Sequence, residues 1–157
     1  MLGLGLRPPG PRLQGFTLME LLVTLAIVAI VSAIAAPSFT GVIERQRVSS
    51  AADSLRSSIE LARSEAIKRN ANVAVVRVGG AWNQGWEVRE GADVLQVAGA
   101  VPRLTISSAV ASLSFNSSGR STAAADFSVV PDSGNAAHAS CVDVTLSGRP
   151  RVIKGSC

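Results

Sequence analysis

The chain has 157 residues, a formal net charge of +4 at pH 7, 47% hydrophobic residues and 17% charged residues. It contains one histidine, no tyrosine and two cysteines. These counts argue against a zinc centre built from pairs of cysteines and histidines, and we expect neither a metal nor a cofactor. Apart from its N-terminal apolar segment, the chain is long enough for one small domain with a modest core.

The N-terminal end joins a basic leader to a long apolar run. Arg7 and Arg12 are the only charges before residue 16, and Glu20 is the only charge within residues 16–36. About 20 apolar residues in a helix cross a bilayer, and the positive-inside tendency keeps the leader cytoplasmic. The alternatives are a secretory signal cleaved near residues 33–36 and an uncleaved single-span anchor. Neither explains an acid inside the run, where an ionised carboxylate is costly.

The segment Gly15-Phe16-Thr17-Leu18-Met19-Glu20 resembles the processing site of class III signal peptides, found in type IV pilins and type II secretion pseudopilins. The resemblance implies that prepilin peptidase cuts between Gly15 and Phe16 and methylates the new amino terminus of Phe16. It implies a single-pass inner-membrane protein with a periplasmic C-terminal domain, which joins other major and minor pilins in an extracellular pilus. The implied regions are a leader peptide (1–15), a transmembrane and filament-core helix (16–40) and a globular domain (41–157).

The same resemblance implies a role in assembly for Glu20. A bare carboxylate among packed apolar helices is unfavourable, whereas one that faces the positive amino terminus of another subunit is compensated. We therefore expect Glu20 to favour one axial register between subunits. Pro37 stands where pilin helices bend, and because proline interrupts helical hydrogen bonds we expect a kink there.

Beyond Gly41 an apolar stripe predicts a helix over residues 41–70. The members of the stripe follow one another at alternating spacings of four and three residues: Val48, Ala52, Leu55, Ile59, Ala62 and Ala66. This period places them on one face of a helix, and we expect that face to pack on the globular domain.

From residue 72 onward, short β-strands alternate with turns. Residues 73–78 and 85–89 predict a hairpin, with Gly79-Gly80 in its connection. Further strands are expected at residues 94–97, 104–107, 113–116, 127–130, 141–146 and 151–153. This order predicts an α+β fold of the pilin type, in which a long kinked N-terminal helix packs on a C-terminal domain (71–157) of antiparallel β-sheets.

Three blocks narrow the resemblance within the pilin superfamily. The FimT/GspH group of minor pilins and pseudopilins has blocks that resemble LARSEAIKRN at residues 61–70, Gly85-Trp86 and FNSSGR at residues 115–120.

For Trp82 and Trp86 we expect at least one ring to pack against the helix stripe. The alternative is an exposed ring that stacks on a nucleic-acid base.

Cys141 and Cys157 are the two cysteines. In the oxidising cell envelope we expect them to form a disulfide, worth about 3 kcal/mol in the chain-entropy estimate. A metal site is disfavoured because only His138 is nearby, and His138 itself is expected to be an exposed loop residue.

Because no G-x-S-x-G motif, phosphate-binding glycine loop or cluster of reactive groups is present, we expect no enzymatic activity.

The C-terminal tail, SGRPRVIKGSC at residues 147–157, holds three cations and no acid. In an extended chain Arg149 and Arg151 project to one side, about 6.6 Å apart, and their guanidinium groups can grip phosphate oxygens. Gly148 permits a tight turn, and a disulfide would tether the tail. The alternative is an edge strand whose charges and proline block unwanted pairing.

Gly148-Arg149-Pro150-Arg151 also resembles the GRxR motif of FimT proteins that bind DNA during natural transformation. The resemblance implies a minor type IV pilin that binds DNA without sequence preference. The expected DNA-binding residues are Gly148, Arg149, Arg151 and Lys154, with Arg103 and Arg120 as candidates to widen the patch. The alternative is a priming or adaptor minor pilin, or a GspH-like type II secretion pseudopilin, with no nucleic-acid ligand.

Overall fold

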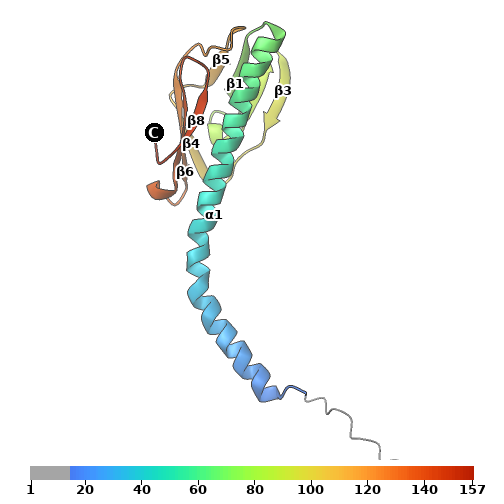
Figure 1. The fold of residues 1–157 in the computed structure, drawn as a ribbon, viewed down its shortest axis with the longest axis vertical. Helices are drawn as coiled ribbons and strands as arrows, with labels where there is room; N and C mark the ends of the chain where they lie inside the picture. Colours follow the sequence, from blue (N-terminus) through green and yellow to red (C-terminus); the bar gives the residue numbers. More distant parts are fainter. Residues whose placement is uncertain (1–14) are drawn as a thin grey trace, which may run out of the picture. The chain divides into compact units, whose positions relative to one another are not determined.

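The computed structural model describes residues 15–157, apart from the side chains of residues 34–38. The chain divides into two compact units, Met1–Ser38 and Phe39–Cys157. Every β-strand that the structure describes lies in the second unit (Figure 1). The leader residues Arg7 and Arg12 lie outside the described residues.

Helix α1 extends over Leu18–Arg69. The Thr17 hydroxyl caps its first turn by accepting the backbone N–H of Glu20 at 3.2 Å. The helix continues through Pro37, and the kink expected there, next to the boundary between the units, stays a prediction. Among the residues that the structure describes, no helix is both long enough and apolar enough to cross a membrane.

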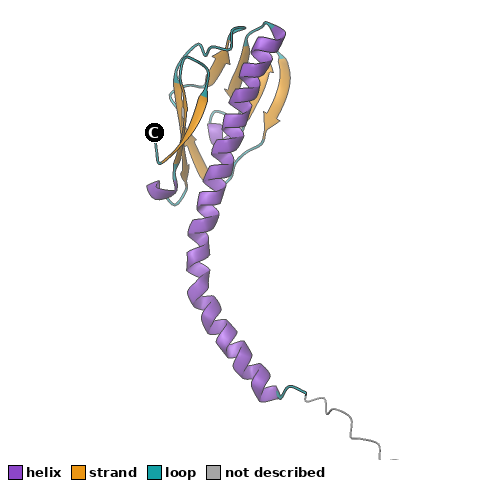
Figure 2. Ribbon diagram, viewed as in Figure 1, coloured by secondary structure: helices purple, strands orange, loops and turns teal. Residues whose placement is uncertain are grey.

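The second unit carries two four-stranded antiparallel sheets, with strand orders β3-β2-β1-β5 and β4-β6-β7-β8. Figure 2 shows the strands in orange and the helices in purple. The eight strands lie within about two residues of the predicted positions, and the β1–β2 hairpin is confirmed. Two short 3₁₀ helices, η1 and η2, interrupt connections between strands. The bounds are β1 Val73–Arg77, η1 Trp82–Gln84, β2 Trp86–Glu90, β3 Asp93–Ala98, β4 Leu104–Ser107, β5 Ser112–Phe115, β6 Ala125–Pro131, η2 Ala136–His138, β7 Ser140–Val144 and β8 Pro150–Lys154.

The apolar stripe of α1 joins one core with residues of both sheets. All six predicted members of the stripe are buried, as are inward-facing residues such as Val75 and Val142. A fully buried leucine or isoleucine contributes about 1.5–3 kcal/mol relative to an exposed one, so this face holds the helix on the sheets. The predicted α+β fold, a long helix followed by antiparallel sheets, is confirmed.

Both tryptophans belong to this core. Trp82 and Trp86 are each 1% exposed. The indole N–H of Trp82 donates to the Val110 carbonyl at 2.9 Å, and its ring meets Phe127 edge to face, with ring centres 4.8 Å apart. The prediction that at least one tryptophan packs inside is confirmed, and the alternative of a ring stacked on a base is wrong because neither ring reaches solvent.

Candidate functional site

The residues of the predicted processing site lie just before and within the first turn of α1. Gly15, Phe16 and Thr17 precede the helix, and Phe16 is exposed. Glu20 lies in the first turn with its side chain exposed. Cleavage between Gly15 and Phe16, methylation of Phe16 and pairing of Glu20 with another subunit remain predictions.

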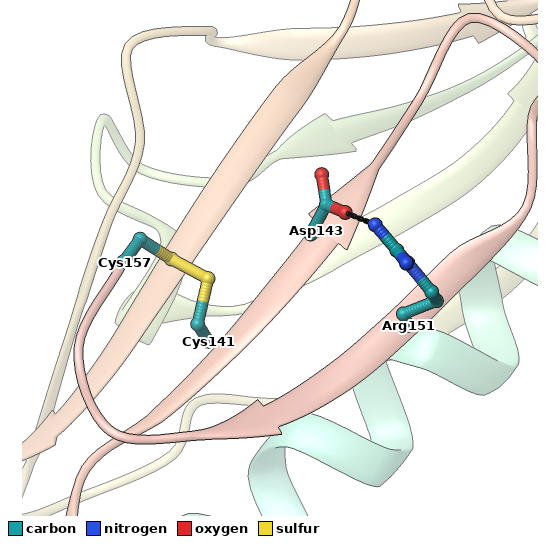
Figure 3. The surroundings of a disulfide bond; sticks show 4 residues. All are labelled: Cys141, Asp143, Arg151 and Cys157. Carbon is teal, nitrogen blue, oxygen red and sulfur yellow. Dashed lines mark hydrogen bonds and ion pairs between the residues drawn. A yellow bond between two sulfur atoms is a disulfide. The ribbon is translucent and has the colours of Figure 1, made fainter.

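The basic tail forms β8, which is an edge strand of its sheet. Strand β8 pairs only with β7, and Arg151 lies opposite Asp143. The Arg151 guanidinium donates to the Asp143 carboxylate at 2.7 Å, while the Arg151 side chain keeps 67% of its surface exposed (Figure 3). Asp143 in turn lies opposite Asp126 of β6. Two acids therefore accompany Arg151 on the face of the sheet that points away from the core.

A disulfide fastens the end of the tail to β7. Cys141 and Cys157 are bonded, with their Cα atoms 5.0 Å apart, which confirms the predicted pairing (Figure 3). The Gly155 backbone N–H also donates to the Ala139 carbonyl at 2.8 Å. Because both attachments lie beyond the last residue of β8, the strand is held at its far end as well as along its ladder.

The turn before β8 packs on a second turn through two glycines. Gly148 has a φ of +75°, and a Cβ there would press against the Gly119 carbonyl oxygen. Gly119 has a φ of +70° and receives a 3.0 Å hydrogen bond from the Arg63 guanidinium of α1 on that same carbonyl. Only glycine fits both needs, positive φ and close approach. Arg120 follows Gly119 and Arg149 follows Gly148. This packing therefore brings the backbones of the two arginines close together.

Two other expected DNA-binding residues lie elsewhere. Because successive strand residues face opposite sides, Lys154 points away from the face of Arg151. Arg103 precedes β4, which pairs with the Pro131 end of β6, whereas β8 begins beside the Ala125 end. The seven residues of β6 separate these ends by roughly 20 Å. Lys154 and Arg103 therefore do not lie in one patch with Arg151, and DNA binding by either of them stays a prediction.

His138 is not the exposed loop residue that the sequence suggested. It ends η2, its side chain is only 12% exposed, and its Nδ1 lies 3.0 Å from the Glu44 carboxylate of α1. The hydrogen bond from His138 is the main reason why the pKa of Glu44 lies below its usual range, and partial burial opposes it. The two residues are 94 positions apart in the sequence, and no local sequence pattern predicts their contact.

The remaining acidic residues form no metal-binding cluster in the described part of the chain. Within residues 15–157, no group of three or more histidine, cysteine, aspartate or glutamate side chains is placed to hold a metal ion. Several acids are instead paired with basic side chains, such as Glu60 with Arg56 and Glu65 with Arg69. These exposed pairs are typical of a solvated helix surface.

Comparisons with known proteins agree with this fold. Crystal structures of the type IV minor pilin FimU of Pseudomonas aeruginosa are similar to this chain. For one of them the TM-score is 0.62 and the sequence identity is 21%, and the match covers 70% of this chain and 90% of FimU. The minor pseudopilin EpsH from the Type 2 Secretion System of Vibrio cholerae is similar with a TM-score of 0.56 and 15% identity, over 69% of this chain and 97% of EpsH. No curated protein sequence matches the chain.

Two family descriptions match the sequence directly. The Prokaryotic N-terminal methylation motif matches residues 11–36, which include the predicted processing site. The family of the Type II transport protein GspH matches residues 51–148, more than half of the chain. The chain therefore belongs to the GspH family, within the type IV pilin superfamily of minor pilins and pseudopilins.

Proposed function

We propose that the chain is a minor pilin of the FimT type, cut by prepilin peptidase between Gly15 and Phe16 and methylated on Phe16. The N-terminal methylation motif over residues 11–36 supports this processing. In the proposal, residues 16–40 anchor the protein in the inner membrane, with the globular domain in the periplasm. The same segment then enters the core of the pilus, beside major and minor pilins.

The exposed apolar side chains of α1 support incorporation into a filament. Within the first unit they include Leu18, Met19, Leu21, Leu22, Val23, Leu25, Ile27, Val28, Ile30 and Val31. A helix that is apolar on all sides requires apolar surroundings, supplied by lipid before assembly and by neighbouring helices afterwards. The chemistry of such a surface is that of packing rather than catalysis, and we propose no enzymatic activity.

A substitution of Glu20 tests whether the chain is incorporated into a filament. A carboxylate among these apolar side chains is compensated if it faces the amino terminus of a neighbouring subunit. Glu20→Ala is expected to leave the globular unit folded but to reduce the amount of protein recovered in sheared pili. Glu60→Ala, on an exposed turn of the same helix, is the matched control. Equal incorporation of wild type and Glu20→Ala would contradict the assigned role.

We further propose that the pilin binds DNA through phosphate contacts, without sequence preference, during DNA uptake in natural transformation. The observation that carries this proposal is the exposure of Arg149 and Arg151, two positions apart, at the start of a tethered edge strand. Both are exposed, and the contact between Gly119 and Gly148 brings the backbone of Arg120 near that of Arg149. Three phosphate contacts correspond to a salt slope of about −2.7 on duplex DNA, which is weak for one subunit. Several subunits are needed for avidity.

The ion pair between Arg151 and Asp143 does not prevent such contacts. An exposed ion pair contributes only about 0–1 kcal/mol, so releasing Arg151 costs little. The guanidinium also carries five N–H donors, and the structure assigns one bond from its Nη2 to Asp143. A phosphate oxygen can therefore be bound beside the carboxylate.

The second candidate function is a priming or adaptor minor pilin, or a type II secretion pseudopilin, with no nucleic-acid ligand. Asp126 and Asp143, side by side on the face of Arg151, favour it because two carboxylates reduce the positive field there. In this reading the charges of β8 keep an exposed strand edge from pairing with other chains.

A titration of the full chain with labelled duplex DNA at several salt concentrations separates the two functions. In a maltoside detergent, Arg149→Gln/Arg151→Gln is expected to weaken binding at least tenfold, since each lost charged contact is worth about 1.5 kcal/mol or more. Arg56→Gln/Arg103→Gln removes the same charge elsewhere and is expected to bind nearly as wild type. Equal binding by wild type and the Arg149/Arg151 variant, or no binding by either, would favour the adaptor.

A further inference from the structure

The third cation of the tail lies in different surroundings from the first two. Lys154 is opposite Ser140 in the β7–β8 ladder, whereas Arg151 is opposite Asp143. Since side chains alternate along a strand, Lys154 lies on the side of the sheet that carries the core residues Val142 and Val144. It therefore contributes to a different surface from the one proposed for DNA.

On that side Lys154 lines a hollow between β8, η2 and α1. The hollow has a volume of about 280 Å³ and is lined by Arg45, Ala137, His138, Ala139, Ser140 and Lys154. At about 30 Å³ per water molecule, this volume accommodates a phosphate group together with several waters. All lining residues belong to the second unit.

The hollow is lined by two cationic side chains, and one carboxylate, Glu44, lies beside it. Among the ion pairs of residues 15–157, none involves Arg45 or Lys154. The nearest acid in the α1 sequence, Glu44, is already hydrogen-bonded to His138. Two cations that line one hollow and form no ion pair outnumber that single carboxylate, which favours an anion between them.

The walls of the hollow are held in place before any ligand binds. The Asn135 side chain accepts the Ala137 N–H at 3.1 Å and caps η2. The contact between His138 and Glu44 fixes η2 to α1, and the Gly155–Ala139 hydrogen bond fixes the end of the tail. Preorganised walls reduce the entropy cost of binding.

We propose that this hollow is an anion site that binds a phosphate group through Arg45 and Lys154. A free phosphate and the headgroup of an anionic phospholipid offer the same chemistry, a tetrahedral anion with several acceptor oxygens. The site is separate from the DNA-binding face, because the two use different cations on opposite sides of β8.

The test uses the full ¹⁵N-labelled chain in a maltoside detergent, which carries no phosphate. Titration with inorganic phosphate is expected to shift the backbone amides of residues 137–140. Arg45→Gln/Lys154→Gln, at two exposed positions, is expected to raise the dissociation constant by at least about tenfold. Arg56→Gln/Arg103→Gln is the charge-matched control. The absence of shifts, or equal shifts in the Arg45/Lys154 variant, would overturn the proposal.

A second arm identifies the source of the phosphate. In nanodiscs of neutral lipid, added phosphatidylglycerol is expected to shift the same amides if a headgroup occupies the site. If only inorganic phosphate shifts them, the ligand is a soluble phosphate. Arg149→Gln/Arg151→Gln is expected to bind phosphate as the wild type does, so loss of DNA binding and loss of this site are separate results.

Discussion

Two parts of α1 share one backbone conformation but differ in where their apolar side chains go. In the first unit Leu25 is 56% exposed and its apolar neighbours are similarly open, whereas Ile59 in the second unit is 0% exposed. The described side chains of the first part are apolar on every side except for Glu20, Thr24 and Ser32, whereas the second part is apolar along one stripe. A striped helix buries its apolar face on its own sheets, while an all-apolar helix needs apolar surroundings from other molecules. We infer that one part serves association and the other serves folding.

The largest expected effect comes from truncating the same amount of side chain in each part. Ile59→Ala is expected to lower the free energy of unfolding by about 2–5 kcal/mol because it leaves a cavity in the core. Leu25→Ala removes no contact within the second unit and is expected to change it by less than about 0.5 kcal/mol. Urea denaturation of the full chain in detergent measures both. Equal losses would contradict the division of the helix into two roles.

The disulfide stabilises the second unit at the C-terminal end of the chain. Cys141→Ser/Cys157→Ser opens a loop with a sequence separation of 16 residues, which is expected to lower the free energy of unfolding by about 3 kcal/mol. The same denaturation experiment measures the loss. Reduction of the wild type with a thiol should reproduce it, and an unchanged midpoint in both would show that the β7–β8 ladder alone holds the tail.

The contact between Glu44 and His138 predicts a pH dependence confined to the second unit. Because the hydrogen bond from His138 holds the folded-state pKa of Glu44 below the ordinary value of a glutamate, the contribution of Glu44 to stability is complete above that ordinary value. The contribution is lost as pH falls through the lower folded pKa. Unfolding measured between pH 3 and 6 should therefore show a smaller acid-induced loss for Glu44→Gln than for wild type. An identical acid profile would contradict the prediction.

The smallest expected effect concerns Asp143. Asp143→Asn removes an exposed ion pair and is expected to change stability by no more than about 1 kcal/mol. If DNA binds at β8, the freed Arg151 is expected to raise the affinity by up to about fivefold. Asp53→Asn, an exposed helix position, makes the same change in net charge and serves as the control. An affinity gain of the same size in both variants would assign the effect to net charge alone.

The elements of the fold were predictable because their signals are local. Spacings of four and three placed Val48, Leu55 and Ile59 on one face, and all three are buried. Turn residues such as Gly79 and Pro102 separated strands whose ends then fell near the observed ones. The pairing of Cys141 with Cys157 followed from their number and the expected compartment.

The predictions that were wrong or missing concern strand register and contacts between residues far apart in the sequence. Counting charges grouped Lys154 with Arg151, but the register of β8 on β7 sends them to opposite faces. Asp143 enters the site from a neighbouring strand, and Glu44 reaches His138 from 94 positions away. Asp143 lies eight residues before Arg151, across a glycine turn, and this spacing is the one sequence signal that could have placed an acid beside the tail.

The most direct test of the account is the intact mass of the chain recovered from the cells that produce it. We predict a chain that begins at Phe16, carries one added methyl group and retains the apolar part of α1. We also predict that the two cysteines are oxidised to a disulfide. A mature chain that begins beyond residue 36 would contradict the account, because the helix assigned to association would be absent from the finished protein.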